Sequence, residues 1–135
     1  MGYLLDTNIC IYIIKKKPES VLRRLGQLPL GEIGISSISV AELDYGARKS
    51  ANPEKNLAAL HQFLLPFEIF SFGYDASSEY GKIRSALEKK GTPIGPVDTF
   101  IAAHARSLRY TLVTNNEREF RRIENLEIEN WVEQS

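Results

Sequence analysis

The sequence predicts an α/β fold with a central, largely parallel sheet. Short apolar runs typical of buried strands alternate with longer segments whose apolar residues recur at helical spacing. Proline and glycine clusters separate several of these segments. Strands that alternate with helices favour parallel pairing within one sheet. The length of 135 residues suits one domain, so we predict a single domain over residues 1–135.

The N-terminal segment is predicted to form one strand and two helices. Tyr3-Leu4-Leu5 is an apolar run that ends on Asp6, as a buried strand would. A helix follows from Asn8 and stops near Lys17, because the residue before a proline disfavours helical geometry. Pro18 suits the first turn of the next helix, which ends at Gly26.

The middle of the chain repeats this alternation. Residues 33–36 form a short apolar run after a Pro29/Gly31 break, and residues 68–72 alternate in polarity, so both are predicted strands. Apolar residues at helical spacing predict helices over 39–49, 53–65 and 75–90, and Gly91 is the expected cap of the last one.

The C-terminal third begins with the turn-rich stretch 91–96. An apolar helix over 97–108 and a strand over 110–114 follow. A short helix over 116–123 and a final strand over 126–128 complete the predicted elements.

Composition excludes several classes of protein. Apolar residues make up 43% and charged residues 25%, which is ordinary for a globular chain. The single cysteine, Cys10, permits no intrachain disulfide, and it is expected in the core. The longest apolar run has six residues and is too short to span a membrane, so we expect a soluble cytoplasmic protein. Seventeen basic residues balance 17 acidic ones, which argues against a broad polycationic nucleic-acid binder.

Four acidic residues lie at junctions between predicted elements: Asp6, Glu42, Asp98 and Glu119. Each has a structural explanation. Asp6 and Asp98 suit the positive ends of helices, and Ser39–Glu42 and Asn116–Glu119 resemble capping boxes. Asp6 and Asp98, however, lie beside apolar segments that are expected to bring their carboxylates to one rim of the sheet.

Clustered carboxylates repel one another unless a cation lies between them. Oxygen ligands suit Mg²⁺ or Mn²⁺ rather than zinc. A few carboxylates that hold such an ion beside a substrate phosphate constitute a site for phosphodiester hydrolysis. The sequence has no GxxxxGK[ST] or GxGxxG motif, which removes most support for a nucleotide-dependent activity.

The chain closely resembles the PIN-domain ribonucleases, and within them the enteric-type VapC toxins of VapBC toxin–antitoxin pairs. The resemblance extends over nearly the whole chain, in blocks at residues 5–8, 36–43, 91–98, 101–105, 112–120 and 128–131. It implies a three-layer α/β/α fold. It also implies endonucleolytic RNA cleavage that requires Mg²⁺ or Mn²⁺.

The family pattern assigns roles to individual residues. Asp6, Glu42 and Asp98 match its three core acids, and Glu119 is the favoured fourth, although Asn116 occupies a position where many relatives have Asp. In this assignment Asp6 and Asp98 bind the metal, while Glu42 and Glu119 hold bound waters or a second ion. Thr7, Asn8, Thr114 and Asn116 match polar residues that line the family's site.

The resemblance also implies partners. The expected substrate is initiator tRNA, cut in its anticodon stem-loop, and the expected partner is a cognate VapB antitoxin. Homodimers and toxin–antitoxin hetero-oligomers are expected as well. Arg118, Arg121 and Arg122 flank Glu119 and are candidates for binding RNA phosphates. If the four acids are set aside as metal ligands, 13 acidic residues remain against 17 basic ones, so the zero net charge is compatible with RNA binding.

Two other functions are alternatives. The first is another α/β phosphoesterase or a phosphate receiver. The aspartyl phosphatases need a second Asp where Asn8 stands, and a receiver needs a late lysine, whereas none follows Lys90. The second is a non-enzymatic PIN-like interaction domain, which predicts the loss of an acid, and all three core acids are present. Neither histidine is expected to act in catalysis: His104 is turned away from Asp98 on the helix, and His61 is a surface position.

Overall fold

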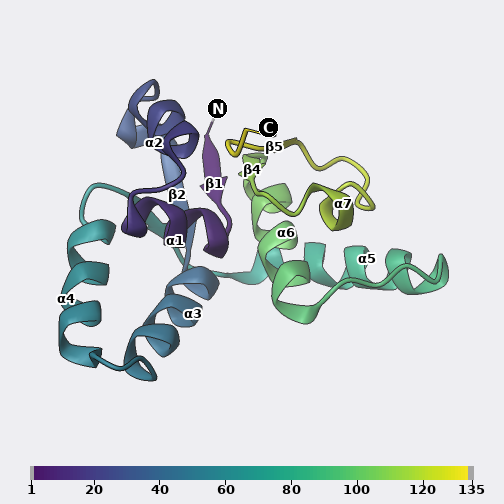
Figure 1. Ribbon diagram of the computed structural model, residues 1–135. Coiled ribbons are helices and arrows are strands. Elements are labelled where there is room, and N and C mark those ends of the chain that lie inside the picture. Colours follow the sequence, from purple (N-terminus) through teal and green to yellow (C-terminus); the bar gives the residue numbers. More distant parts are fainter. Residues whose placement is uncertain (1, 134–135) are drawn as a thin grey trace.

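The structure is a computed structural model that describes residues 2–133. Within that range five strands form one sheet in the order β3-β2-β1-β4-β5 (Figure 1). All four neighbouring pairs are parallel, which confirms the predicted sheet. The strands are β1 (Tyr3–Leu5), β2 (Ile33–Ser36), β3 (Glu68–Phe70), β4 (Thr111–Val113) and β5 (Ile128–Glu129).

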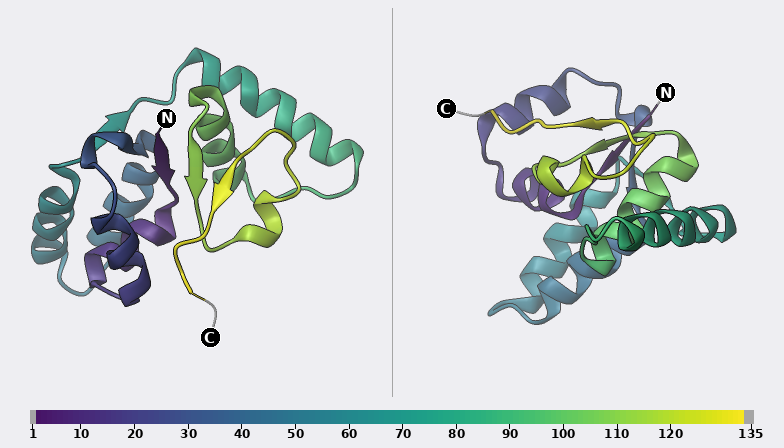
Figure 2. Two further views of the ribbon diagram at one scale, coloured as in Figure 1. Left: turned by 90° about the horizontal axis from the view of Figure 1, so that it is seen from above. Right: turned by 90° about the vertical axis from the view of Figure 1, so that its right-hand side faces the viewer.

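Helices cover both faces of the sheet, so the fold has the three layers that the family resemblance implies (Figures 1 and 2). The elements on one face are α1 (Thr7–Lys15), α2 (Glu19–Gly26), α3 (Ser37–Arg48) and α4 (Pro53–Leu64), with a 3₁₀ turn at Leu30–Glu32. Those on the other are α5 (Tyr74–Lys89), α6 (Pro96–Leu108) and α7 (Glu117–Phe120).

Alternation along the central strands separates two hydrophobic cores. Leu5 and Val113 pack with α1 to α4, whereas their neighbours Leu4 and Leu112 pack with α5 to α7. All four side chains are fully buried. Because successive side chains of a strand point to opposite faces, one short apolar run supplies both cores. This is why three-residue strands suffice at the centre of the sheet.

One error in the predicted elements, at the start of α3, changes the interpretation of a candidate site residue. The helix begins at Ser37, because the Ser36 hydroxyl accepts a hydrogen bond from the Ile38 amide at 3.0 Å and caps it. Ser39 is therefore a buried residue inside the helix, and the predicted Ser39–Glu42 capping box is wrong. Glu42 consequently lies farther along α3 than a capping residue would.

Several other boundaries shift by one to three residues. α1 begins at Thr7 rather than Asn8, and α7 covers only Glu117–Phe120 of the predicted 116–123. β3 ends at Phe70 rather than at residue 72. β5 begins at Ile128 rather than at residue 126, because Ile128 is the residue that pairs with Leu112 of β4. The C-terminal glycine of α5 is predicted correctly: Gly91 follows the cap residue and has a φ of 72°, a left-handed conformation that glycine favours.

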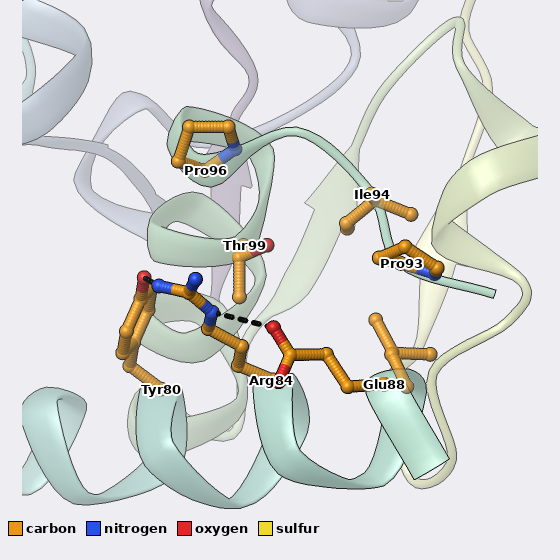
Figure 3. A pocket seen from close by; sticks show the side chains of 8 residues that line it. Tyr80, Arg84, Glu88, Pro93, Ile94, Pro96 and Thr99 are labelled. Atoms are coloured by element: carbon orange, nitrogen blue, oxygen red, sulfur yellow. Dashed lines mark hydrogen bonds and ion pairs between the residues drawn. The ribbon is translucent and has the colours of Figure 1, made fainter. Parts of the chain in front are cut away.

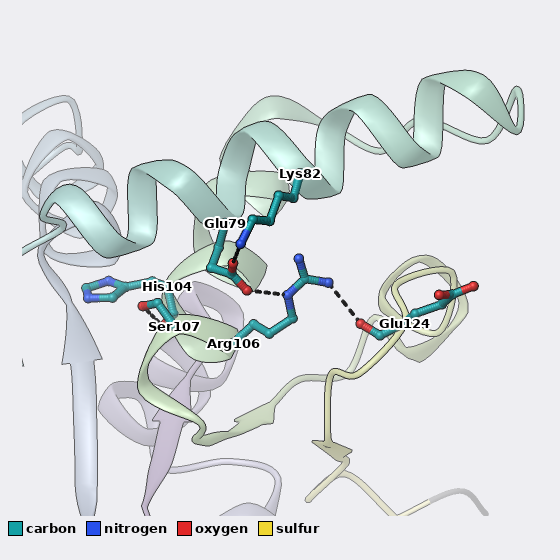
Figure 4. Close-up of polar contacts among 6 residues, drawn as sticks. All are labelled: Glu79, Lys82, His104, Arg106, Ser107 and Glu124. Atoms are coloured by element: carbon teal, nitrogen blue, oxygen red, sulfur yellow. Dashed lines mark hydrogen bonds and ion pairs between the residues drawn. The ribbon is translucent and has the colours of Figure 1, made fainter.

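An ion-pair network joins α5, α6 and the segment after α7 (Figure 4). The Glu79 carboxylate accepts hydrogen bonds from Arg106 at 2.7 Å and Lys82 at 3.1 Å, and Arg106 also donates to the Glu124 carbonyl at 3.0 Å. Arg106 is the main cause of the lowered pKa of Glu79. This network fixes α6, and α6 carries Asp98 in its first turn.

No helix within residues 2–133 combines the length and the apolar character needed to cross a bilayer.

Candidate active site

The candidate site is built on the carboxyl ends of β1 and β4, two neighbouring strands. Asp6 follows β1 and Thr114 follows β4, and the Thr114 hydroxyl donates to Asp6 Oδ2 at 2.8 Å. Asp6 Oδ1 accepts from the Thr7 amide at 2.8 Å and so caps α1. Asp6 is only 5% exposed. Burial raises the pKa of Asp6, while these two hydrogen bonds act in the opposite direction.

Asp98 brings a second carboxylate to this site from the first turn of α6. Its pKa is raised to about 6, first by burial and then by the negative charges of Asp6 and Glu119. Three carboxylates from β1, α6 and α7 therefore interact electrostatically. Such repulsion is relieved by protonation or by a bound cation.

Asn116 links two of these carboxylates. Its side-chain amide donates to Glu119 Oε2 at 2.8 Å and approaches Asp98 Oδ2 at 3.5 Å. Its backbone amide donates to the Thr114 hydroxyl at 2.9 Å. Asn116 is the N-cap of α7 but its side chain accepts no capping hydrogen bond, so the predicted Asn116–Glu119 capping box does not form. The result is a continuous polar network from Asp6 to Glu119.

Glu42 lies apart from this network. It is exposed on α3, and within residues 2–133 it has no hydrogen bond or ion pair to the other three acids. It borders an open groove of about 630 Å³ together with Thr7 and Asn8. Thr7 also connects the two regions, because its hydroxyl donates to Ser39 on α3 at 3.1 Å. Glu42 therefore shares a groove with Thr7, the neighbour of Asp6, and the structure does not bring it into the network of the other three acids.

The donor chemistry of the site fits a hard divalent cation. The four predicted acids offer oxygen ligands only, and Mg²⁺ and Mn²⁺ prefer such ligands. In the described part of the chain, no three side chains of His, Cys, Asp or Glu surround a common ion position. An ion held by Asp6 and Asp98 would therefore complete its coordination with water and substrate, as Mg²⁺ usually does.

Two residues outside the acidic cluster, Cys10 and His61, lie where the sequence predicts them. Cys10 is fully buried, and burial raises the pKa of its thiol. His61 is exposed. His104 is buried on α6, where its Nδ1 lies 2.7 Å from the Ser36 hydroxyl, and within residues 2–133 it forms no hydrogen bond with the four acids. Neither the contact between His104 and Ser36 nor the burial of Ser39 was predicted from the sequence. The serine-rich stretch 36–39, which follows a predicted strand, was the only sequence signal for these two features.

The three arginines near Glu119 differ in their partners. Arg121 pairs with Glu117 at 2.7 Å, and Arg122 donates to the Pro93 carbonyl at 3.1 Å. Arg118 is exposed and has no ion-pair partner within residues 2–133. Of the predicted phosphate-binding group, Arg118 alone makes no side-chain hydrogen bond or ion pair within residues 2–133, whereas Arg122 holds the loop that precedes Asp98 through a neutral carbonyl.

A pocket of about 170 Å³ lies beside the same loop, between α5 and Pro93–Pro96 (Figure 3). Arg84 reaches into it but donates to Glu88 at 3.0 Å and to the Tyr80 hydroxyl at 2.9 Å. Its charge is thus compensated within the pocket. None of the four candidate acids lines this pocket.

The comparisons with known proteins define the class of this fold and site. The family model described as PIN domain matches residues 3–126, which include every residue of the acidic cluster. The chain is 46% identical over 131 residues to the tRNA(fMet)-specific endonuclease VapC of Shigella flexneri, covering 97% of this chain and 98% of that one. It is 48% identical over 132 residues to Ribonuclease VapC2 of Haemophilus influenzae, covering 98% and 99%.

A solved structure leads to the same family. VapBC2 from Rickettsia felis, bound to a DNA fragment from its promoter, superposes with a TM-score of 0.92 at 47% identity, covering 98% of this chain and 100% of that one. The chain therefore belongs to the VapC family of PIN-domain ribonucleases. This membership confirms the resemblance found in the sequence blocks and supports ribonuclease activity over the two alternative functions.

The hydrogen bond from Thr114 to Asp6 gives a prediction on stability. Thr114→Val removes a donor from a buried carboxylate and leaves the Asn116 amide without its acceptor. We expect a loss of about 2 kcal/mol in the free energy of unfolding, since bonds to charged groups are worth about 1.5–3 kcal/mol. Urea unfolding at pH 7.5 measures it. Thr111→Val, at the start of β4, is the control, because its hydroxyl makes no hydrogen bond within residues 2–133, and equal losses would contradict the prediction.

Proposed function

We propose that this protein is the toxin of a VapBC pair and cleaves RNA as a metal-dependent endoribonuclease. The convergence of Asp6, Asp98 and Glu119 is the observation that carries the proposal, because burial, followed by the negative charges of Asp6 and Glu119, raises the pKa of Asp98 to about 6. A ribonuclease that cuts a phosphodiester needs compensating positive charge where these carboxylates meet.

Each residue has a task in this proposal. Asp6 and Asp98 hold Mg²⁺ or Mn²⁺, with Asp6 kept in place by its two hydrogen bonds. The ion supplies charge neutralisation at the scissile phosphate and a more acidic bound water. Glu119, oriented by Asn116, and Glu42, from the opposite side, hold water molecules or a second ion. No histidine takes part.

Initiator tRNA, cut in its anticodon stem-loop, is the proposed substrate. The support is that relatives from Shigella flexneri and Salmonella typhimurium, each 46% identical over 97% of this chain, are named tRNA(fMet)-specific endonucleases. Single-stranded loops are where proteins commonly read RNA sequence. A cytoplasmic location is part of the proposal, because the substrate is found there.

A VapB antitoxin is the proposed partner. The support comes from the VapBC complexes of Rickettsia felis and Salmonella typhimurium, whose toxin chains superpose on this one with TM-scores of 0.92. We propose that the antitoxin covers the acidic site and thereby inhibits it, and that toxin dimers and toxin–antitoxin hetero-oligomers form.

Metal removal tests the proposed function directly. Purified protein is incubated with initiator tRNA and, separately, with elongator tRNAs, in Mg²⁺, in Mn²⁺ or in EDTA. We expect a single cut in the anticodon stem-loop of initiator tRNA with either metal and none in EDTA. Cleavage that continues undiminished in EDTA would refute the metal-dependent mechanism. Cleavage of other RNAs with initiator tRNA left intact would refute the proposed substrate while leaving ribonuclease activity in place.

A further inference from the structure

A stripe of three side chains runs along α3 away from the acidic site. Glu42, Tyr45 and Lys49 are spaced by three and four residues, so they share one face of the helix. Tyr45 is 62% exposed, although it is a large aromatic residue. The Lys49 ammonium lies 5.0 Å from the centroid of the Tyr45 ring, in a cation–π contact. An aromatic ring and a cation thus follow directly after a candidate catalytic carboxylate.

All three residues border the groove of about 630 Å³ that begins at Thr7 and Asn8. Its charged lining is Lys15 and Lys49 against Glu42 alone. Neither lysine has an ion-pair partner within residues 2–133, in contrast to Arg48 next to it, which pairs with Asp44. The groove therefore has free positive charge at a distance of two helical turns from the acid, about 10 Å along α3.

We propose that this groove holds the RNA strand next to the scissile phosphate, with one base stacked on Tyr45 and phosphates bound by Lys49 and Lys15. This inference rests on the proposed ribonuclease function and adds a binding site to it. Proteins that hold single-stranded RNA combine a basic groove with exposed aromatic rings, because every base has a face that stacks. The groove also has apolar lining residues, among them Ile11, Ile14 and Leu60. The proposal therefore rests on the exposed ring of Tyr45 and on the two lysines without ion-pair partners within residues 2–133, not on the groove as a whole.

The test separates binding from cleavage. Binding of a fluorescein-labelled single-stranded oligoribonucleotide is measured by anisotropy in the Asp98→Asn variant, which is expected to be inactive. Adding Tyr45→Ala should weaken binding about tenfold, since one stacked base contributes roughly that much or more. Tyr45→Trp should retain binding. Tyr74→Ala is the matched control, because Tyr74 is an 89% exposed tyrosine at the start of α5, outside the groove.

Two further readouts involve the active protein and the basic residues. With Asp98 intact, Tyr45→Ala should raise KM about tenfold and leave kcat nearly unchanged. Lys49→Gln should lower the dependence of log Kd on log salt concentration by about one, as the loss of one phosphate contact would. Because Tyr45 and Lys49 are exposed, these variants should unfold at the same temperature as the parent protein.

The possible outcomes distinguish this inference from the function on which it rests. Equal RNA binding by the Tyr45→Ala and Tyr74→Ala variants would overturn the stacking site, even if the protein cleaves RNA normally. The same holds if Tyr45→Ala weakens only the binding of antitoxin, because the groove is then a protein interface. If the parent protein fails to cleave any RNA, the proposed function is wrong, and the anisotropy measurement still decides whether Tyr45 binds RNA.

Discussion

Replacing Asp98 with Asn is expected to abolish RNA cleavage and to stabilise the protein at neutral pH. The loss of activity should exceed about 100-fold, because even partners outside the direct ligand set of a metal commonly cost 10–100-fold. The gain in stability has a separate cause. Burial and the charges of Asp6 and Glu119 make the Asp98 carboxylate costly in the folded protein. The substitution removes that charge and retains the shape.

The direction of the pH dependence follows from the raised pKa. The pKa of Asp98 is about 6 in the folded protein, whereas its ordinary value, expected in the unfolded chain, is 3.8. Between these values the folded state binds more protons, so the Asp98 contribution to stability is lost as the pH rises. Well above pH 6, where Asp98 is ionised in both states, the cost is fully present. Allowing for solvent screening at this half-buried position, we expect Asp98→Asn to be more stable by about 1–2 kcal/mol at pH 7.5.

Urea unfolding of both proteins between pH 4 and 7.5 measures this difference, which should be small at pH 4 and largest above pH 6. Added Mn²⁺ should raise the Tm of the parent protein and have less effect on the variant, because only the parent retains both proposed ligands. A variant that is less stable than the parent at every pH would show that the Asp98 carboxylate contributes favourable contacts that outweigh its repulsion.

The sequence was sufficient to predict the sheet and much of the site because both follow from local patterns. Asp6 ends an apolar strand, and Asp98 lies in the first turn of an apolar helix. In a parallel sheet the carboxyl ends of the strands share one edge, so these two positions were expected to converge. The charge of Asp6 indeed contributes to the raised pKa of Asp98.

Interactions between distant segments could not be predicted in this way. The Thr114–Asp6 hydrogen bond joins residues that are 108 positions apart, and a threonine after a strand has no sequence signal for its partner. The start of α3 was misplaced because Ser36, Ser37 and Ser39 are all plausible caps by type. Ser36 is the cap because it ends β2, a position that depends on pairing with β1 and β3.

The position of Glu119 depends on a buried phenylalanine, and this dependence gives the second large predicted effect. α7 has only four residues, too few for a helix to be stable by itself. Phe120 is fully buried in the core beneath α5 and α6, where Leu112 and Ile123 belong to the same cluster. We infer that this packing holds α7 in place, and with it Glu119.

Phe120→Ala should therefore affect both stability and catalysis. The free energy of unfolding should fall by about 3–5 kcal/mol, the usual cost of truncating a buried phenylalanine. Well below the Tm of the variant, kcat should still be strongly reduced, because α7 no longer fixes Glu119. Phe120→Leu keeps most of the buried volume and should retain most of both properties.

Phe67→Ala is the matched control for this prediction. Phe67 is a buried phenylalanine of the other core, on the face of the sheet covered by α1 to α4, and should lose comparable stability. Its core cluster contains no residue of α6 or α7, which carry Asp98 and Glu119, so kcat at low temperature should be retained. If both variants lose kcat equally, the catalytic effect is general loosening of the fold. If kcat falls in the Phe120→Ala variant alone, the packing of Phe120 is what positions Glu119.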